Sequence, residues 1–209
     1  MELTEAFNAV YQYFSGNPIE LLGALTGILC VYLNAKENIW GWPIGIVSVA
    51  CYVIVFWNAF LFGDFLLHII YVILGFYGWY YWLYGGKKKD ALPISVSPKK
   101  ELLFFGALGS ILILPIGWLL SLYPNASVPY WDATTTIFSL LAQWQLARKR
   151  LENWLTWLFV DTLCVVIYYY KELYITSGLY FVYLILATLG YLEWRRHMNK
   201  RTAAKYSQA

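Results

Sequence analysis

Two tryptophans and an aspartate share one face of a segment that the sequence predicts to be helical. Within residues 152–161, Trp154, Trp157 and Asp161 follow one another at spacings of three and four, which places them on one side of an α-helix. Indole faces attract cations and stack on aromatic rings, and a carboxylate neutralises positive charge. The three side chains therefore suit a flat cationic ligand, although tryptophans also pack cores and mark membrane interfaces.

A second stripe, earlier in the chain, carries smaller polar groups. Thr136, Ser139 and Gln143 are spaced by three and four residues, behind Asp132. Gln143 can hydrogen-bond an amide or hydroxyl of a ligand, whereas Ser and Thr also serve as small packing residues between membrane helices. Asp132 is expected near the start of its helix, where a carboxylate can cap the free backbone N–H groups.

Three further side chains complete the predicted ligand site, and they are Asn153, Tyr180 and Tyr183. Enzyme signatures such as H-E-x-x-H, G-x-S-x-G and the P-loop are absent. The two histidines, His68 and His197, do not predict a metal site. We therefore expect no catalytic residues, no metal and no cofactor. An intramembrane enzyme would need a second catalytic group near Asp161, and His68 is a distant candidate.

The composition is that of a membrane protein. Of the 209 residues, 60% are hydrophobic and only 13% are charged, whereas soluble domains carry about 25% charged residues. A soluble enzyme, a disordered chain and a nucleic-acid binder are thereby disfavoured. Continuous apolar runs near the ~20 residues needed to cross a bilayer predict membrane-spanning helices, not barrel strands. Seven such runs cover 19–35, 40–60, 64–84, 101–122, 131–147, 153–170 and 174–194.

The basic residues predict the orientation of these helices. Fourteen of the fifteen Lys and Arg residues follow odd-numbered helices, and only Lys171 lies on the other side. The positive-inside rule then places the N-terminal segment 1–18 outside and the basic tail 195–209 in the cytoplasm. The basic loop 85–100 is also cytoplasmic in this topology. Its charge is read as a topology signal and not as a nucleic-acid site.

An internal repeat divides the chain. Residues 78–82 and 190–194 both begin with Gly and end with Trp. We call the separation between positions 78 and 190 the repeat offset. The same offset pairs Trp42 with Trp154 without a gap. Chance matches also arise between two aromatic-rich stretches. We predict two parallel three-helix bundles, 19–84 and 130–194, joined by a linker helix at 101–122. Transporters built from such repeats bind substrate near the midplane, between the halves.

These motifs resemble those of the PnuC family of bacterial vitamin transporters. Glu-Asn-Trp-Leu-Thr-Trp at 152–157 resembles the family's E-N-W-x-x-W signature. Tyr-Trp-Asp at 130–132 resembles its aromatic-Trp-Asp motif, and Gly-Phe-Tyr-Gly-Trp at 75–79 its glycine-aromatic motif. The resemblance extends over nearly the whole chain and implies an all-α membrane protein with a three-plus-one-plus-three arrangement similar to SWEET sugar transporters.

The resemblance also implies a function. Family members import unphosphorylated vitamin precursors, most familiarly nicotinamide riboside, across the bacterial inner membrane by facilitated diffusion with alternating access. A cytoplasmic kinase traps the substrate, and homotrimers embedded in lipid are expected. The resemblance assigns Trp154 and Trp157 to ligand stacking and makes Gln143 an amide partner.

Asp161 departs from the family pattern. Nicotinamide riboside carriers typically have Asn at this position, so thiamine, carried by PnuT relatives, stays an alternative substrate. Neutral riboflavin suits a buried carboxylate less well. A proton-coupled carrier and a small channel or membrane adaptor without substrate are further hypotheses.

Overall fold

The computed structural model describes residues 16–58, 62–86, 89–123 and 127–206. Most of the expected outer segment 1–18, and Lys87 and Lys88 of the basic loop, lie outside these residues. The described chain forms seven helices, which confirms the all-helical prediction. They are α2 (Pro18–Ala35), α3 (Gly41–Asn58), α4 (Phe62–Tyr84), α5 (Lys99–Ser121), α6 (Pro129–Ala147), α7 (Asn153–Tyr170) and α8 (Tyr174–Tyr206).

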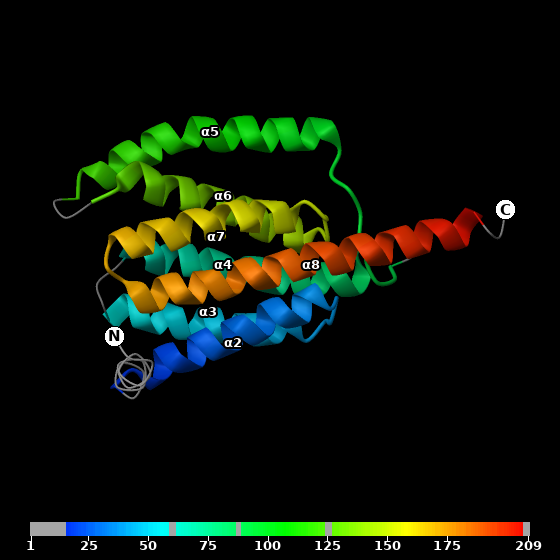
Figure 1. The fold of residues 1–209 in the computed structure, drawn as a ribbon, viewed down its shortest axis with the longest axis horizontal. Coiled ribbons are helices and arrows are strands. Elements are labelled where there is room, and N and C mark those ends of the chain that lie inside the picture. The colour runs from blue at the N-terminus through cyan, green and yellow to red at the C-terminus, as the bar shows by residue number, and fades with distance from the viewer. Residues whose placement is uncertain (1–15, 59–61, 87–88, 124–126, 207–209) are drawn as a thin grey trace.

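The apolar runs predict the helix bounds to within two residues, except at the end of α8. That helix continues past residue 194 to Tyr206 and projects beyond the other helices (Figure 1). Five helices, α2, α3, α4, α5 and α8, are long and apolar enough to cross a membrane. Helices α6 and α7 have a similar length but are not among these five, and they carry most of the polar side chains predicted to bind a ligand.

The helices pack as two groups of three. Helix α3 packs between α2 and α4, and α7 packs between α6 and α8. The groups meet where α2 packs against α8 and α4 against α6. Helix α5 runs along one flank, against α6 (Figure 1). Its Ile111 and Leu114 side chains are 65% and 67% exposed, as expected for a surface that faces lipid hydrocarbon.

The helix bounds follow the repeat offset. The same offset that relates position 78 to position 190 also relates α3 (41–58) to α7 (153–170). The turns after α2 and α6 also repeat. Glu37 and Lys149 both adopt a left-handed backbone, with φ of 55° and 53°. In each turn the N–H groups of the left-handed residue and of the residue after it bond back to the helix carbonyls in a Schellman motif, as from Asn38 N to Leu33 O at 2.8 Å.

Tryptophans pack against glycines at the same end of the two groups. The Trp42 ring contacts Gly78, and a Cβ added to Gly190 would lie 2.7 Å from the Trp154 ring. The ring of Trp42 packs edge to face on that of Trp82, with the ring centroids 5.4 Å from each other. In the second group Trp154 packs in the same way on Trp194, which corresponds to Trp82, at the same distance. We call this the basic end, defined by the turns 36–40 and 148–152 and the segment 89–98. Its rings form a buried apolar cluster.

Candidate functional site

A cavity of about 2050 Å³ separates the two groups of helices. At the end opposite the basic end, its lining includes Asp64 and Lys171. It extends inward as far as Trp42 and Trp154. Of the described lining residues, none belongs to the two turns or the segment that define the basic end. The cavity therefore opens away from the basic end.

Most of the predicted ligand residues meet in this cavity. Eight of the nine line it, namely Thr136, Ser139, Gln143, Trp154, Trp157, Asp161, Tyr180 and Tyr183. The structure does not bring Asn153 to them. Asn153 is fully buried, and its Nδ2 donates to the carbonyl oxygen of Arg150 at 2.5 Å. It therefore braces the turn before α7.

Asp161 is a buried carboxylate on the cavity wall. Its residue is 3% exposed, and within the described residues it has no hydrogen-bond donor or cation as a partner. Lys171, the basic residue at the cavity mouth, is paired instead with Asp132 at 3.1 Å and 3.2 Å. Since an ionised carboxylate is costly to bury alone, a cation or a proton that enters the cavity would stabilise Asp161.

Asp132 does not cap its helix as expected. Val128 occupies the N-cap position of α6, and no side chain bonds the cap. The ion pair with Lys171 explains the difference, because it draws the carboxylate toward the α7–α8 turn. The pair also neutralises the one basic residue predicted on this side of the membrane.

The two tryptophans of α7 are placed differently. Trp154 is 1% exposed, because its ring is held between Gly190 and Trp194. Trp157 is only partly buried and packs at the edge of the apolar cluster. Both border the cavity. Trp157 therefore has more ring surface available to a ligand, while Trp154 also supports the wall behind it.

Helix α6 supplies the polar wall, and α4 reaches across to it. The Tyr71 hydroxyl donates to Ser139 Oγ at 2.7 Å, and Ser139 in turn donates to the carbonyl of Thr136 at 3.1 Å. Gln143 lines the cavity. Two residues later, Gln145 turns toward α7 and accepts a hydrogen bond from the Thr156 hydroxyl at 2.7 Å.

Sequence reasoning missed Tyr71 as part of the site. The signal was present, because Tyr71 matches Tyr183 at the repeat offset, and both line the cavity. His68 also lines it, packs against Phe56 at 4.7 Å, and places Nδ1 2.8 Å from the carbonyl oxygen of Asp64. These contacts agree with a structural role for this histidine.

Comparison with known proteins gives consistent results. The nicotinamide riboside transporter PnuC of Escherichia coli (strain K12) is 24% identical over 214 residues, covering 88% of this chain and 87% of that protein. The riboflavin/roseoflavin transporter RibM of Streptomyces davaonensis is 24% identical over 189 residues, covering 84% and 83%.

The fold also matches a solved structure. The crystal structure of the vitamin B3 transporter PnuC superposes with a TM-score of 0.68 at 22% identity, covering 96% of this chain and 94% of that one. Residues 17–196 match the sequence model described as nicotinamide mononucleotide transporter. These matches confirm the resemblance drawn from the motifs, and the chain belongs to the nicotinamide mononucleotide transporter family.

Proposed function

We propose that this chain imports nicotinamide riboside, a cationic and unphosphorylated vitamin precursor, across the inner membrane of a bacterium. Asp161 is the observation that carries the proposal. It is a buried carboxylate without a protein cation, on the wall of a cavity that also presents the Trp157 ring. A bound pyridinium ring supplies the missing positive charge and stacks on the indole.

The remaining contacts follow from the α6 wall. In this proposal Gln143 bonds the carboxamide, and Ser139 and Thr136, which line the same cavity, bond the ribose hydroxyls. The name of the Escherichia coli relative supports this choice of substrate. Tyr180 and Tyr183, which meet edge to face at 5.8 Å, border the same space from α8.

Transport proceeds by facilitated diffusion with alternating access. The positive-inside rule places the N-terminus outside and the basic end in the cytoplasm, so the cavity of this structure faces outward. The two three-helix groups rock about the bound ligand and expose it to the cytoplasm. A cytoplasmic kinase then phosphorylates the vitamin, which prevents its return. Assembly as a homotrimer in the lipid bilayer is part of the proposal.

Thiamine is a second candidate, and Asp161 favours it too. Thiamine is also flat and cationic, and its aminopyrimidine can donate to a carboxylate through paired, charge-assisted hydrogen bonds. Riboflavin, which appears in the name of the Streptomyces relative, is neutral and leaves the Asp161 carboxylate uncompensated. It is the weakest of the three.

Titration calorimetry of the purified protein separates these candidates. Nicotinamide riboside, thiamine and riboflavin are titrated separately into the wild type and into Asp161→Asn. We expect the riboside to bind the wild type most tightly. Tight binding of thiamine alone, lost in Asp161→Asn, would reassign the substrate. Binding of riboflavin alone would contradict a cation site, and binding of none would contradict the transport of these vitamins.

A further inference from the structure

Two indole hydrogen bonds join the helix groups at the basic end. Trp82 Nε1 of α4 donates to the carbonyl oxygen of Leu146 on α6 at 2.9 Å. Trp194 Nε1 of α8 donates to the carbonyl oxygen of Asn34 on α2 at 3.0 Å. The two donors are related by the repeat offset, and so are the two acceptors. The same buried contact is therefore made twice. In one case the first group donates to the second, and in the other the second group donates to the first.

An ion pair joins the same two groups beside these indoles. Glu37 and Lys149 are also related by the repeat offset, and their charged atoms lie 3.0 Å from each other. The ion pair thus connects equivalent positions of the two halves. Their side chains are only 12% and 8% exposed.

Both residues occupy a backbone conformation that favours glycine. Their positive φ values carry a steric cost for a residue with a Cβ. Lys89 and Glu172 share this conformation, so it is the contact between the two charged side chains, and not the backbone alone, that singles out this pair.

The electrostatics of the pair agree with mutual stabilisation. Burial alone would raise the pKa of Glu37, but hydrogen bonding to His197 and the Lys149 charge outweigh it, and the pKa of Glu37 is lowered. Burial lowers the pKa of Lys149, and Glu37 opposes this change. Arg201 adds a positive charge that acts on both residues. The Lys149 ammonium also lies 4.5 Å from the centre of the Trp82 ring.

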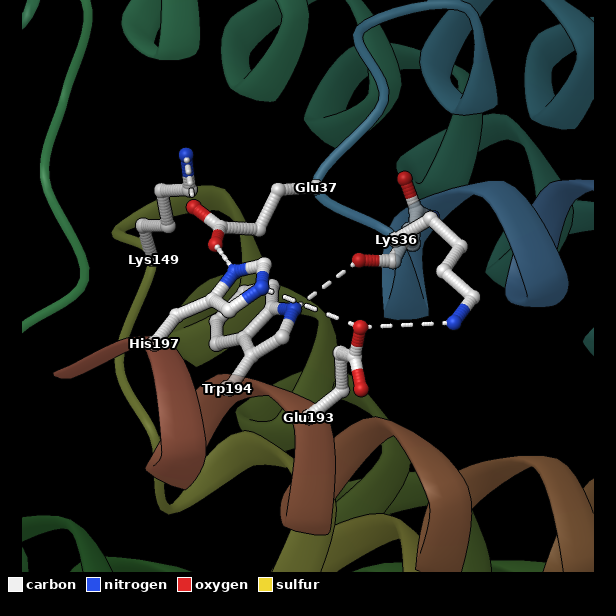
Figure 2. A network of polar contacts seen from close by, with 7 residues as sticks. Lys36, Glu37, Lys149, Glu193, Trp194 and His197 are labelled. Carbon is white, nitrogen blue, oxygen red and sulfur yellow. Dashed lines mark hydrogen bonds and ion pairs between the residues drawn. The ribbon is translucent and has the colours of Figure 1, made fainter. Parts of the chain in front are cut away.

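The extension of α8 holds the first turn. Residues beyond 196 have no counterpart in α4, which ends at Tyr84, and His197 is the first of them. Its Nδ1 lies 2.5 Å from Glu37 Oε1. One turn earlier, Glu193 pairs with Lys36 at 3.3 Å and lies 3.7 Å from His197 Nε2. Figure 2 shows the turn and the helix meeting through these side chains.

The segment after α4 holds the second turn in a different way. Ser95 N donates to the carbonyl of Lys149 at 3.1 Å, and Leu151 N donates to the carbonyl of Ser95 at 2.9 Å. Ile94 is buried in the tryptophan cluster. The first turn is therefore held by the C-terminal part of α8, and the second turn by the segment after α4. In both cases the contact comes from the opposite group.

We propose that the Glu37–Lys149 ion pair and the two indole bonds form the gate that closes the cavity at the basic end, with His197 and Ser95 as its two latches. The gate rests on the proposed transport function. Each of these contacts joins one helix group, directly or through its latch, to the other. The groups cannot separate at this end, as an inward-open state requires, until the contacts break.

Thiol labelling from each side of the membrane tests the gate without any vitamin. Cys30 lines the cavity and is partly exposed, whereas Cys51 is buried and does not line it. Cys164 lines the cavity but is as buried as Cys51, so Cys30 is the reporter. A membrane-impermeant methanethiosulfonate reagent is applied to sealed vesicles of both orientations. In the wild type we expect Cys30 to react from the side opposite the basic end only. Reaction from both sides, with Cys51 protected, would overturn the gate.

Charge reversal supplies the decisive variants. Glu37→Lys places two ammonium groups together, and we expect labelling of Cys30 from the basic side to rise at least about tenfold, since breaking a buried pair is strongly unfavourable. Glu37→Lys combined with Lys149→Glu restores the pair in reverse and should return labelling toward the wild-type rate. The His197 contact with residue 37 is not restored, so recovery is partial.

Labelling of the buried Cys51 would reveal that charge reversal impairs folding. In that case two milder variants test the gate instead. Glu37→Gln removes the charge, and Glu101→Gln is its matched control. Glu101 pairs with Arg150 at 3.3 Å near the basic end but does not join the two groups. We expect labelling of Cys30 from the basic side to increase in Glu37→Gln only. Equal labelling in both, or no recovery in the double variant, would overturn the assignment. A failure of vitamin binding would leave the labelling results unaffected.

Discussion

The two halves of the transporter share a scaffold but not a cavity lining. Trp157, Asp161 and Gln143 of the second half occupy positions that correspond, by the repeat offset, to Gly45, Val49 and Val31 of the first. All six residues line the cavity. At these three positions the first half therefore contributes space and an apolar surface, whereas the second half contributes groups that can recognise charge and hydrogen-bonding atoms.

The basic end shows the opposite pattern. Trp82 and Trp194 make the same bond in both halves, and Glu37 and Lys149 occupy equivalent turns with opposite charges. In the proposed rocking mechanism, matched contacts are expected where the two halves close, whereas recognition of one small molecule needs no such match. Within that proposal, the ligand-binding positions differ between the halves and the indole and ion-pair contacts at the basic end are equivalent.

The largest expected effect tests the shared scaffold. Trp42→Ala and Trp154→Ala each remove a buried ring that packs against a glycine and another tryptophan. We expect each to lower the free energy of unfolding by about 3–5 kcal/mol, by similar amounts because the environments are equivalent. Denaturant unfolding in detergent measures both. A large loss for one variant and none for the other would break the equivalence of the halves.

A smaller effect sharpens the difference between the linings. Trp157→Ala should weaken binding of a cationic vitamin by about 1–2 kcal/mol, because it removes one cation–π contact. Trp118→Ala is the control, since Trp118 lies on α5 and is 60% exposed, and it should leave affinity unchanged. Titration calorimetry measures the affinity of both variants for the vitamin. Unchanged affinity in Trp157→Ala would remove this ring from the site.

The smallest effect concerns the tyrosines that reach across between the halves. Tyr71→Phe removes the bond to Ser139 and should cost about 0.5–1.5 kcal/mol of stability. Its counterpart Tyr183 approaches Gly27, which offers no hydroxyl at the position equivalent to Ser139, so Tyr183→Phe should cost less. Thermal unfolding compares the two variants. The reverse order would contradict this reading of the asymmetry.

Helical periodicity explains how much of the site could be predicted. Trp154, Trp157 and Asp161 share a face whatever surrounds them, so their spacing alone predicts one cavity wall. Asn153 adjoins Trp154 in the motif, yet one residue turns the helix by about 100°, and its side chain bonds Arg150 instead.

Tertiary packing explains what could not be predicted. The near-complete burial of Trp154 depends on Gly190 of another helix, which no local pattern reveals. The charge pattern predicts a basic tail after residue 194. These residues continue α8 because Arg, Lys and Met favour helices, and His197 is held by Glu37 from the other half.

The most direct test of charge recognition by Asp161 compares two ligands that differ by one hydride on the ring. Nicotinamide riboside is cationic, and its dihydro form has the same ribose and carboxamide on a neutral ring. We predict that the wild type binds the cationic form at least about tenfold more tightly, and that Asp161→Asn reduces this preference. Equal affinity of the wild type for both forms would contradict the claim.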